Sequence, residues 1–211
     1  MDRIIAVGDS NTFGYHLEAL DYPTPTTPSL YAWPSILGSL TNLEVVNLSF
    51  PGNGYKSIWH TVNTFNFEPN DHLIILYPPE HYRVDILQEN NINRLRWYEK
   101  NLESKVLFKY IFNKHDQIIE DYLIIDHIQY IFSTKVKSII QILFSVNEEN
   151  VCPITQNIRK VYPNLGNIKF ANFDMFTLFE LYPKDRAFDN RHPGKIIQQE
   201  FAKQIYNNYF K

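Results

Sequence analysis

The first apolar run of the chain, Ile4 to Val7, limits the possible folds more than any other feature, because polar residues do not interrupt it. A short run of mostly branched apolar side chains is typical of a strand covered on both faces, as in a parallel sheet. The run stops at Gly8–Asn11 (Gly-Asp-Ser-Asn), which is good turn chemistry. We therefore expect this turn at the carboxyl end of a buried parallel strand, where open α/β sheets bind their ligands.

Alternation of strands and helices continues along the chain and predicts its fold class. Further strands are predicted at residues 44–48, 72–77 and 139–146, with a weaker pattern at 168–173. Helices are predicted at 33–40, where Pro34 marks the first turn, and at 55–65, 116–132, 155–162 and 193–210. The first three strands and their helices have the spacing of right-handed parallel crossovers. We predict an α/β fold with a parallel sheet, in one domain over residues 1–211.

Two segments do not fit this alternation. The stretch 22–28 (Tyr-Pro-Thr-Pro-Thr-Thr-Pro) predicts a loop, because proline fixes φ and has no N–H donor. This loop follows the serine turn, so it is either one wall of a pocket or a simple surface connection. Residues 80–116 hold charged and Asn-rich segments, and they predict a loop with irregular helix.

Composition narrows the classes of function. The net charge is −3 with both signs interspersed, so no basic patch indicates a nucleic-acid partner. Cys152 is the only cysteine, which excludes an intramolecular disulfide and a thiolate metal cluster. No apolar run has the length of a membrane span and no signal peptide is evident, so we expect a cytoplasmic protein outside the membrane. The many aromatics, 14 Tyr and 15 Phe among them, are expected mostly in the core, and exposed ones would suit a sugar or a partner.

Asp189 and His192 precede the last predicted helix and are three residues apart. At this spacing one tight turn holds the carboxylate against one imidazole nitrogen and leaves the other nitrogen free to take a proton. A serine hydroxyl needs such a base to be an effective nucleophile, and the carboxylate orients the imidazole. Ser10 is the candidate nucleophile for this pair. The alternatives are that Gly8–Asn11 is only a turn, that Asp189 caps the helix, and that His192 is a solvated loop residue.

Three segments together resemble conserved blocks of the SGNH (GDSL-type) hydrolases. Residues 8–14 (Gly-Asp-Ser-Asn-Thr-Phe-Gly) resemble the first block. Residues 33–37 and then 46–54 are similar to the approach to the second block, with Gly52 at its glycine. Residues 189–193 match the final Asp-x-x-His-Pro block. The matches occur in the family's order and span almost the whole chain.

The resemblance implies a three-layer α/β/α sandwich with a flavodoxin-like parallel sheet, and hydrolysis of esters or acyl groups. It implies that Ser10 is the nucleophile, His192 the base and Asp189 its orienting carboxylate. The backbone N–H groups of Ser10 and Gly52 would face the developing oxyanion, where donors contribute most. No metal or organic cofactor is implied. Further candidates for substrate or oxyanion contacts flank these positions: Asp9, Asn11 and Asn53.

One block of the family has no counterpart in this chain. The family has Gly-x-Asn-Asp after the third strand, and its Asn is an oxyanion donor, whereas residues 76–83 read Leu-Tyr-Pro-Pro-Glu-His-Tyr-Arg. Losing one such donor costs roughly two to three powers of ten in rate. The candidates to replace it are Asn53, His81 and Arg83. His16 and His81 also lie near predicted pocket loops as candidates for substrate contact, and no histidines show metal-ligand spacing.

Two functions follow as hypotheses. The first is a serine esterase or deacylase that hydrolyses a small ester or an O-acetylated carbohydrate through Ser10, His192 and Asp189. The second is a catalytically weakened SGNH-like domain that binds a glycan or a protein, which the missing block and the aromatics motivate. A nucleotide binder is disfavoured, because neither Gly-x-Gly-x-x-Gly nor a P-loop follows a predicted strand. The sequence leaves the oligomeric state open.

Overall fold

The computed structural model describes residues 1–18, 26–78, 83–88, 91–96, 114–144 and 170–211. Its centre is a four-stranded sheet in the order β2-β1-β3-β6, in which every pair of neighbours is parallel. The strands are β1 (Arg3–Val7), β2 (Glu44–Asn47), β3 (Asp71–Tyr77) and β6 (Ser138–Leu143). The predicted parallel sheet is therefore confirmed, with bounds within a few residues of those expected.

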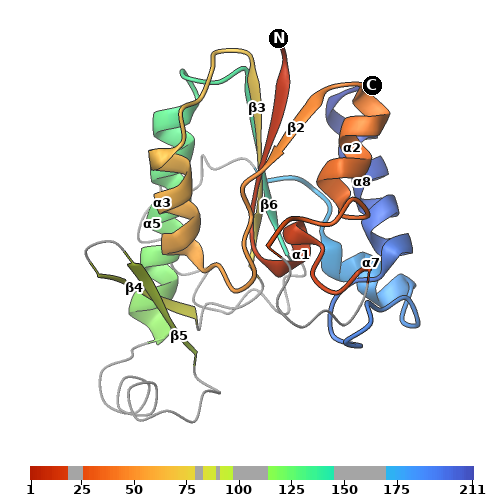
Figure 1. Cartoon of the computed structure of the whole chain (residues 1–211). Helices are drawn as coiled ribbons and strands as arrows, with labels where there is room; N and C mark the ends of the chain where they lie inside the picture. Colours follow the sequence, from red (N-terminus) through yellow and green to blue (C-terminus); the bar gives the residue numbers. More distant parts are fainter. Residues whose placement is uncertain (19–25, 79–82, 89–90, 97–113, 145–169) are drawn as a thin grey trace.

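Helices cover both faces of this sheet (Figure 1). One face carries α3 (Tyr55–Thr64) and α5 (Lys114–Phe132), and the other carries α2 (Trp33–Thr41), α7 (Met175–Leu181) and α8 (Lys195–Tyr209). A single helical turn, α1 (Ser10–Phe13), follows the carboxyl end of β1. The chain thus has the three-layer α/β/α arrangement that the sequence predicts.

The sheet separates two hydrophobic cores, because successive side chains of a strand point to opposite faces. One core joins β1 and β3 to α3 and α5, and its fully buried members include Ile5, Leu73, Ile75, Ile58, Val62, Ile125 and Ile128. The other joins the same strands to α2 and α8, and its fully buried members include Ile4, Ile74, Leu76, Trp33, Leu37, Phe201 and Ile205. Burial on both faces explains why these strands read as continuous apolar runs.

The strand order reverses beside β1. The chain passes from β1 to β2 on one side, and β3 then pairs with the other side of β1. In open α/β sheets, ligands bind outside the carboxyl ends of the strands at such a reversal. Ser10 begins α1 just beyond the end of β1, so the topology puts it at this point.

The prediction for residues 80–116 is wrong where the structure describes them. An antiparallel hairpin, β4 (Arg83–Gln88) paired with β5 (Asn91–Arg96), occupies part of this stretch. Val84, Ile86, Ile92 and Leu95 mark a partial alternation of apolar and polar residues, but the Asn and charged residues between them are unfavourable in strands and obscured it. Residues 79–82, 89–90 and 97–113 lie outside the described residues.

The remaining predictions are tested only in part, because many of their residues lie outside the described ones. The helix predicted at 155–162 lies outside the described residues, as does most of the loop at 22–28. Of the weak strand predicted at 168–173, residues 168–169 lie outside the described residues, and Phe170 forms a parallel bridge with Gln141. Asp174 then caps α7, accepting a hydrogen bond from the Thr177 N–H at 2.6 Å. This short helix was not predicted, although an Asp before an apolar run is an N-cap signal.

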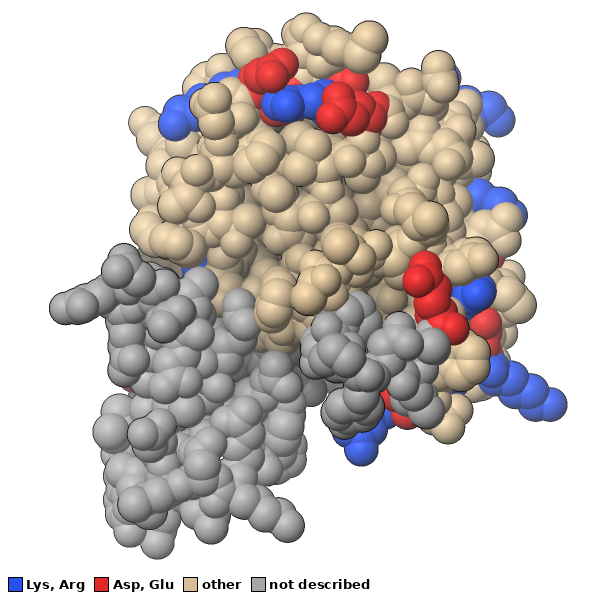
Figure 2. Space-filling model, in the orientation of Figure 1, with Lys and Arg blue, Asp and Glu red and all other residues tan. Residues whose placement is uncertain are grey.

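Opposite charges meet at the amino-terminal edge of the sheet. The Arg3 guanidinium lies 2.8 Å from Asp71 and 3.3 Å from Glu68, and the Lys137 ammonium lies 2.5 Å from Asp2. Figure 2 shows acidic and basic side chains side by side along this upper edge. These ion pairs lie away from α1, at the opposite ends of the strands (Figure 1).

Candidate active site

The Ser10 turn is shaped by residues on both sides of the serine. Asp9 is fully buried, and its Oδ1 accepts hydrogen bonds from the Asn11 backbone N–H at 2.9 Å and the Asn11 side-chain amide at 3.0 Å. This is N-cap geometry, so it starts a helix at Ser10. A Cβ at Gly8, the residue after β1, would lie 2.2 Å from Thr12 Oγ1 and 2.9 Å from the Leu76 carbonyl oxygen, so a side chain there would force its neighbours to shift. Asp9 is therefore the N-cap of the helix that Ser10 begins, and Asn11 is its hydrogen-bond partner. The substrate contact predicted for these two residues stays a prediction.

Asp189 and His192 lie in a closed loop that leads into α8. The Gly194 N–H donates to the Asp185 carbonyl at 3.1 Å, and the Ala187 N–H donates to the His192 carbonyl at 3.0 Å. Inside the loop, Asp189 Oδ1 accepts from the backbone N–H groups of Arg191 at 3.0 Å and His192 at 3.1 Å. These two backbone hydrogen bonds hold the Asp189 carboxylate in place independently of its contact with the imidazole.

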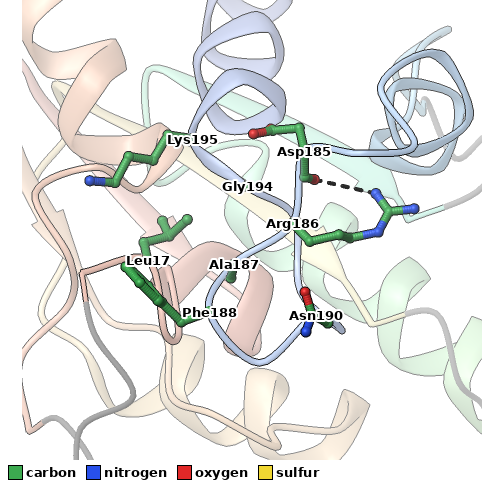
Figure 3. A pocket seen from close by; sticks show the side chains of 8 residues that line it. All are labelled: Leu17, Asp185, Arg186, Ala187, Phe188, Asn190, Gly194 and Lys195. Atoms are coloured by element: carbon green, nitrogen blue, oxygen red, sulfur yellow. Dashed lines mark hydrogen bonds between the residues drawn. The ribbon is translucent and has the colours of Figure 1, made fainter.

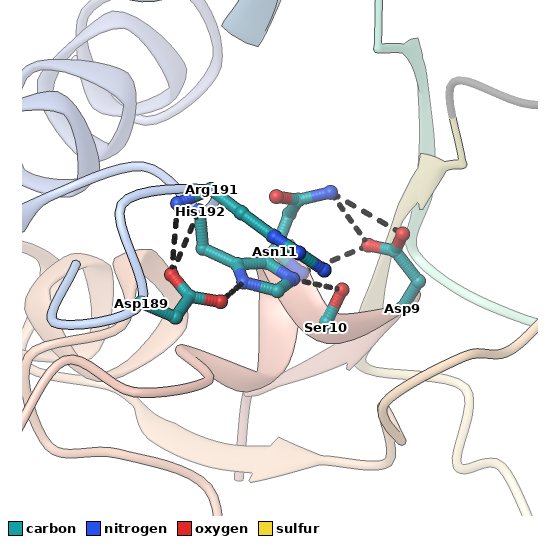
Figure 4. A network of polar contacts seen from close by, with 6 residues as sticks. All are labelled: Asp9, Ser10, Asn11, Asp189, Arg191 and His192. Atoms are coloured by element: carbon teal, nitrogen blue, oxygen red, sulfur yellow. Dashed lines mark hydrogen bonds and ion pairs between the residues drawn. The ribbon is translucent and has the colours of Figure 1, made fainter. Parts of the chain in front are cut away.

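The structure brings these two segments together (Figure 4). His192 Nδ1 lies 2.5 Å from Asp189 Oδ2, and His192 Nε2 lies 2.9 Å from Ser10 Oγ. An ionised carboxylate can only accept, so the Nδ1–H donates to Asp189, and Nε2 is left to accept from the serine hydroxyl. This is the arrangement in which an imidazole takes the proton of an attacking serine.

The alternative positions considered for these residues are wrong. Asp189 does not cap α8, because Gly194 is the N-cap and the carboxylate that reaches the first turn belongs to Asp185, at 2.7 Å from the Ile197 N–H. His192 is not a solvated loop residue, since only 22% of its side chain is exposed and both ring nitrogens have partners.

Burial and hydrogen bonding act in opposite directions on Asp189. Desolvation raises the pKa of its carboxyl, but the hydrogen bonds from the Arg191 and His192 backbone N–H groups and from the His192 imidazole favour the charged form. The net result is a pKa below the ordinary aspartate value. Asp189 is therefore an anion wherever the imidazole needs a negative partner.

Gly52 and Asn53 lie in the loop after β2, which is fastened to the end of β1. The Phe50 N–H donates to the Gly8 carbonyl at 3.4 Å, and the Asn53 side-chain amide donates to the same carbonyl at 3.0 Å. Gly52 has a φ of 86°, a left-handed conformation that a side chain would strain. Asn53 is buried and holds the loop in place, and its role as an oxyanion donor stays a prediction.

The other candidates divide between described and masked parts of the chain. His81 lies outside the described residues, and Arg83 is the first residue of β4, without a described side chain. His16 is described: it has a φ of 59°, and its ring centre lies 3.8 Å from that of Tyr15.

Two aromatic residues near Ser10 were not singled out from the sequence. Tyr15 presents its ring edge-on to His192, with 5.5 Å between ring centres. Phe50, 47% exposed, packs against Phe13, whose ring also contacts Tyr15. Tyr15 directly follows the first recognised segment and Phe50 lies within the second, which was the available signal, but ring orientation is a tertiary property.

A second Ser–His pair lies at the opposite edge of the sheet. Ser138 Oγ is 2.8 Å from His72 Nδ1, and the nearest carboxylate oxygen on the other side of that ring, from Asp2, is 3.9 Å away. The Lys137 ammonium donates a hydrogen bond to the same Asp2 oxygen. This pair has no helix turn at the serine, and it provides an internal comparison for the Ser10 site.

An open cavity of about 430 Å³ lies beside the loop that carries Asp189 and His192. Its lining comes from Leu17, the loop and the start of α8, and it includes neither Ser10 nor His192. Figure 3 shows Lys195 and Arg186 pointing away from each other at its two sides.

Among the described residues, no cluster of His, Cys, Asp or Glu is arranged to hold a metal ion. No described helix is long and apolar enough to cross a membrane.

Solved structures give the clearest comparison. A lipolytic protein of the G-D-S-L family from Veillonella parvula DSM 2008 is similar over the whole of both chains, with a TM-score of 0.51 and 16% identity. An acetyl xylan esterase, Est2A, from the rumen bacterium Butyrivibrio proteoclasticus is similar over all of this chain and 65% of its own, with a TM-score of 0.56 and 15% identity. The chain has the SGNH hydrolase fold.

A third solved structure with the SGNH fold is a carbohydrate esterase whose active site is described as having divergent catalytic and non-catalytic binding functions. It is similar over all of this chain and 69% of its own, with a TM-score of 0.56 and 16% identity. No family model and no curated protein matches the sequence. At 15–16% identity these similarities concern the fold, and both carbohydrate esterases are longer than this chain.

Proposed function

We propose that this protein is a serine hydrolase that cleaves a small ester or an O-acetylated carbohydrate. The observation that carries the proposal is the continuous series of hydrogen bonds from Ser10 Oγ through His192 to Asp189. Its position at the carboxyl end of β1, beside the reversal of strand order, supports it. So does the SGNH fold, which the chain shares with a lipolytic protein and an acetyl xylan esterase.

The proposed reaction has two halves. Ser10 Oγ attacks the acyl carbon while its proton passes to His192 Nε2, and the charge of the resulting imidazolium is balanced by Asp189. The N–H groups of Ser10 and Gly52 are the proposed donors to the oxyanion. Collapse breaks the bond to the alcohol, which leaves with the proton from His192. A water molecule, deprotonated by the same imidazole, then releases the acid and restores Ser10.

The simplest test compares Ser10→Ala with Ser138→Ala, using p-nitrophenyl acetate and acetylated xylan as substrates. Ser138 is also hydrogen-bonded to a histidine, so the two variants remove the same group from two Ser–His pairs. Ser10→Ala is expected to lose at least three powers of ten in kcat, and Ser138→Ala to retain wild-type turnover.

Circular dichroism and a urea titration are the controls, since both variants should stay folded. Turnover by Ser10→Ala at the wild-type rate would contradict the proposal. A wild-type protein that is folded yet hydrolyses neither substrate would contradict it for these two ester classes.

We propose non-catalytic binding of a carbohydrate as the second candidate function. The absence of Gly-x-Asn-Asp after β3 favours it, because an oxyanion donor of the family has no counterpart in the sequence. The similar carbohydrate esterase with non-catalytic binding functions in its active site supports it as well. Calorimetry with unacetylated xylo-oligosaccharides would show binding with no turnover of p-nitrophenyl acetate. Turnover without measurable binding would exclude this second function.

A further inference from the structure

The turn that carries Ser10 is too short to satisfy its own backbone. The last four C=O groups of any helix lack intrahelical partners, and α1 has only four residues. Ser10 O accepts from the N–H of Gly14, the C-cap of α1, and the other three partners come from elsewhere in the fold. They are the Gln198 side chain for Asn11 O, the Asn47 side chain for Thr12 O and the Ser29 N–H for Phe13 O, at 3.0 Å in each case.

Of these partners, Gln198 makes the longest connection in sequence. Its Nε2 donates to the Asn11 carbonyl, 187 residues away, and its Oε1 accepts from the Trp33 N–H at 2.9 Å. Trp33 is the first residue of α2, so its N–H also lacks an intrahelical partner. One side-chain amide, 1% exposed, thus satisfies two buried backbone groups that belong to different helices.

Gln198 lies in the first turn of α8, the helix that begins three residues after His192. Asp185 fastens the loop of His192 to the same turn through the Ile197 N–H. The base and Gln198 are therefore on one rigid unit, and the nucleophile and Asn11 are on another. The Gln198 side-chain amide makes a direct hydrogen bond between these two units. The bond is to Asn11, the residue next to Ser10, which is itself bonded to His192.

We propose that Gln198 is a positioning residue, which holds α1 against α8 so that Ser10 Oγ stays within reach of His192 Nε2. Its catalytic consequence rests on the proposed hydrolase function. Gln198 contacts neither ring nor hydroxyl, and it acts only through the backbone of α1. A displacement of about 1 Å between reacting groups can cost a hundredfold in rate, so a single buried bond at this junction has a large effect. The His192–Asp189 pair lies within one loop and does not depend on Gln198.

The test compares Gln198→Met with Gln141→Met. Gln141 is an equally buried glutamine on β6 that bonds Tyr77 Oη at 2.6 Å and Gln129 at 2.8 Å, so its variant also loses two side-chain hydrogen bonds. Both variants should unfold at lower urea concentration than the wild type. Only Gln198→Met is expected to lower kcat, by about ten- to a hundredfold, with KM changed less than twofold. The Nδ1 proton resonance of His192 should persist in both variants.

A crystal structure of the variant gives a readout that needs no turnover. In Gln198→Met the distance between Ser10 Oγ and His192 Nε2 should lengthen beyond about 3.5 Å, outside hydrogen-bond range, with the Asp189 contact retained. Gln198→Asn, one methylene too short to bridge both helices, is the milder variant if Gln198→Met does not fold. An unchanged 2.9 Å distance, or an equal fall of kcat in the two Met variants, would overturn the proposal. If the wild type does not hydrolyse esters, the hydrolase function is refuted. The distance between Ser10 Oγ and His192 Nε2 in the variant would still test whether Gln198 positions α1 against α8.

Discussion

At the scale of single residues, the site depends on a carboxylate that its own loop keeps ionised. The pKa of Asp189 is lowered in the folded protein, while the unfolded chain has the ordinary value of about 3.9. In acid the unfolded state therefore binds more protons than the folded state, so the free energy of unfolding decreases as the pH is lowered. The stabilisation from Asp189 is fully present above about pH 4, and it is lost as pH falls through the lower folded-state pKa.

This linkage predicts a difference between wild type and Asp189→Asn in urea titrations from pH 7 to pH 3. The free energy of unfolding of the wild type should fall more steeply below about pH 4 than that of the variant, because Asn has no proton to bind. Circular dichroism at pH 7 is the control, and it should show that both proteins are folded. Parallel curves for wild type and Asp189→Asn would contradict the hydrogen bonding assigned to this carboxylate.

At the scale of elements, α1 is a four-residue helix that depends on its N-cap, and α7 offers a matched comparison. Asp9 caps α1 and Asp174 caps α7, and both aspartates are almost completely buried. Replacing either with Ala should destabilise the protein by about 0.5–2 kcal/mol, measured by urea denaturation. Only Asp9→Ala should also lower kcat, since only α1 carries the serine. Equal losses of activity in both variants would show that α1 has no special role.

The elements that could be predicted from the sequence are those whose local pattern agrees with their burial. Ile4 to Val7 and Leu73 to Leu76 are apolar throughout and lie between two layers of helices. The hairpin β4–β5 was missed because its Asn and Arg residues contradict strand propensity, so pairing outweighs local preference there. The link from Gln198 to α1 was also beyond sequence reasoning, since helical spacing places Gln198 on the apolar face of α8 but does not name its partner.

At the scale of the whole molecule, the sheet divides the interior into two separate clusters of buried hydrophobic residues. Ile58 on α3 belongs to one core and Ile205 on α8 to the other, and both are fully buried. Ile58→Val and Ile205→Val should each cost about 0.5–1.5 kcal/mol. The double variant should cost the sum within about 0.5 kcal/mol. A coupling energy above about 1 kcal/mol in urea denaturation would show that the layers are not independent.

The candidate site is also a property of the whole molecule. Ser10 and His192 are 182 residues apart, and the sheet reversal beside β1 and the packing of α8 on α2 bring them to 2.9 Å. Sequence motifs identified both residues as candidates. Their separation along the chain could not predict that the two side chains are within hydrogen-bond distance. The replacement for the missing Asn block stays a prediction, because His81 lies outside the described residues and the side chain of Arg83 is not described.

Mass spectrometry after reaction with a fluorophosphonate ester shows whether His192 and Asp189 make Ser10 a nucleophile. Attack by Ser10 Oγ on phosphorus expels fluoride, while the serine proton passes to His192. We expect one phosphonyl adduct on the Ser10 peptide of the wild type, none on that of Ser10→Ala, and labelling at least about a hundredfold slower in His192→Ala. A folded wild type that forms no adduct, or Ser10 labelled equally fast without His192, would contradict it.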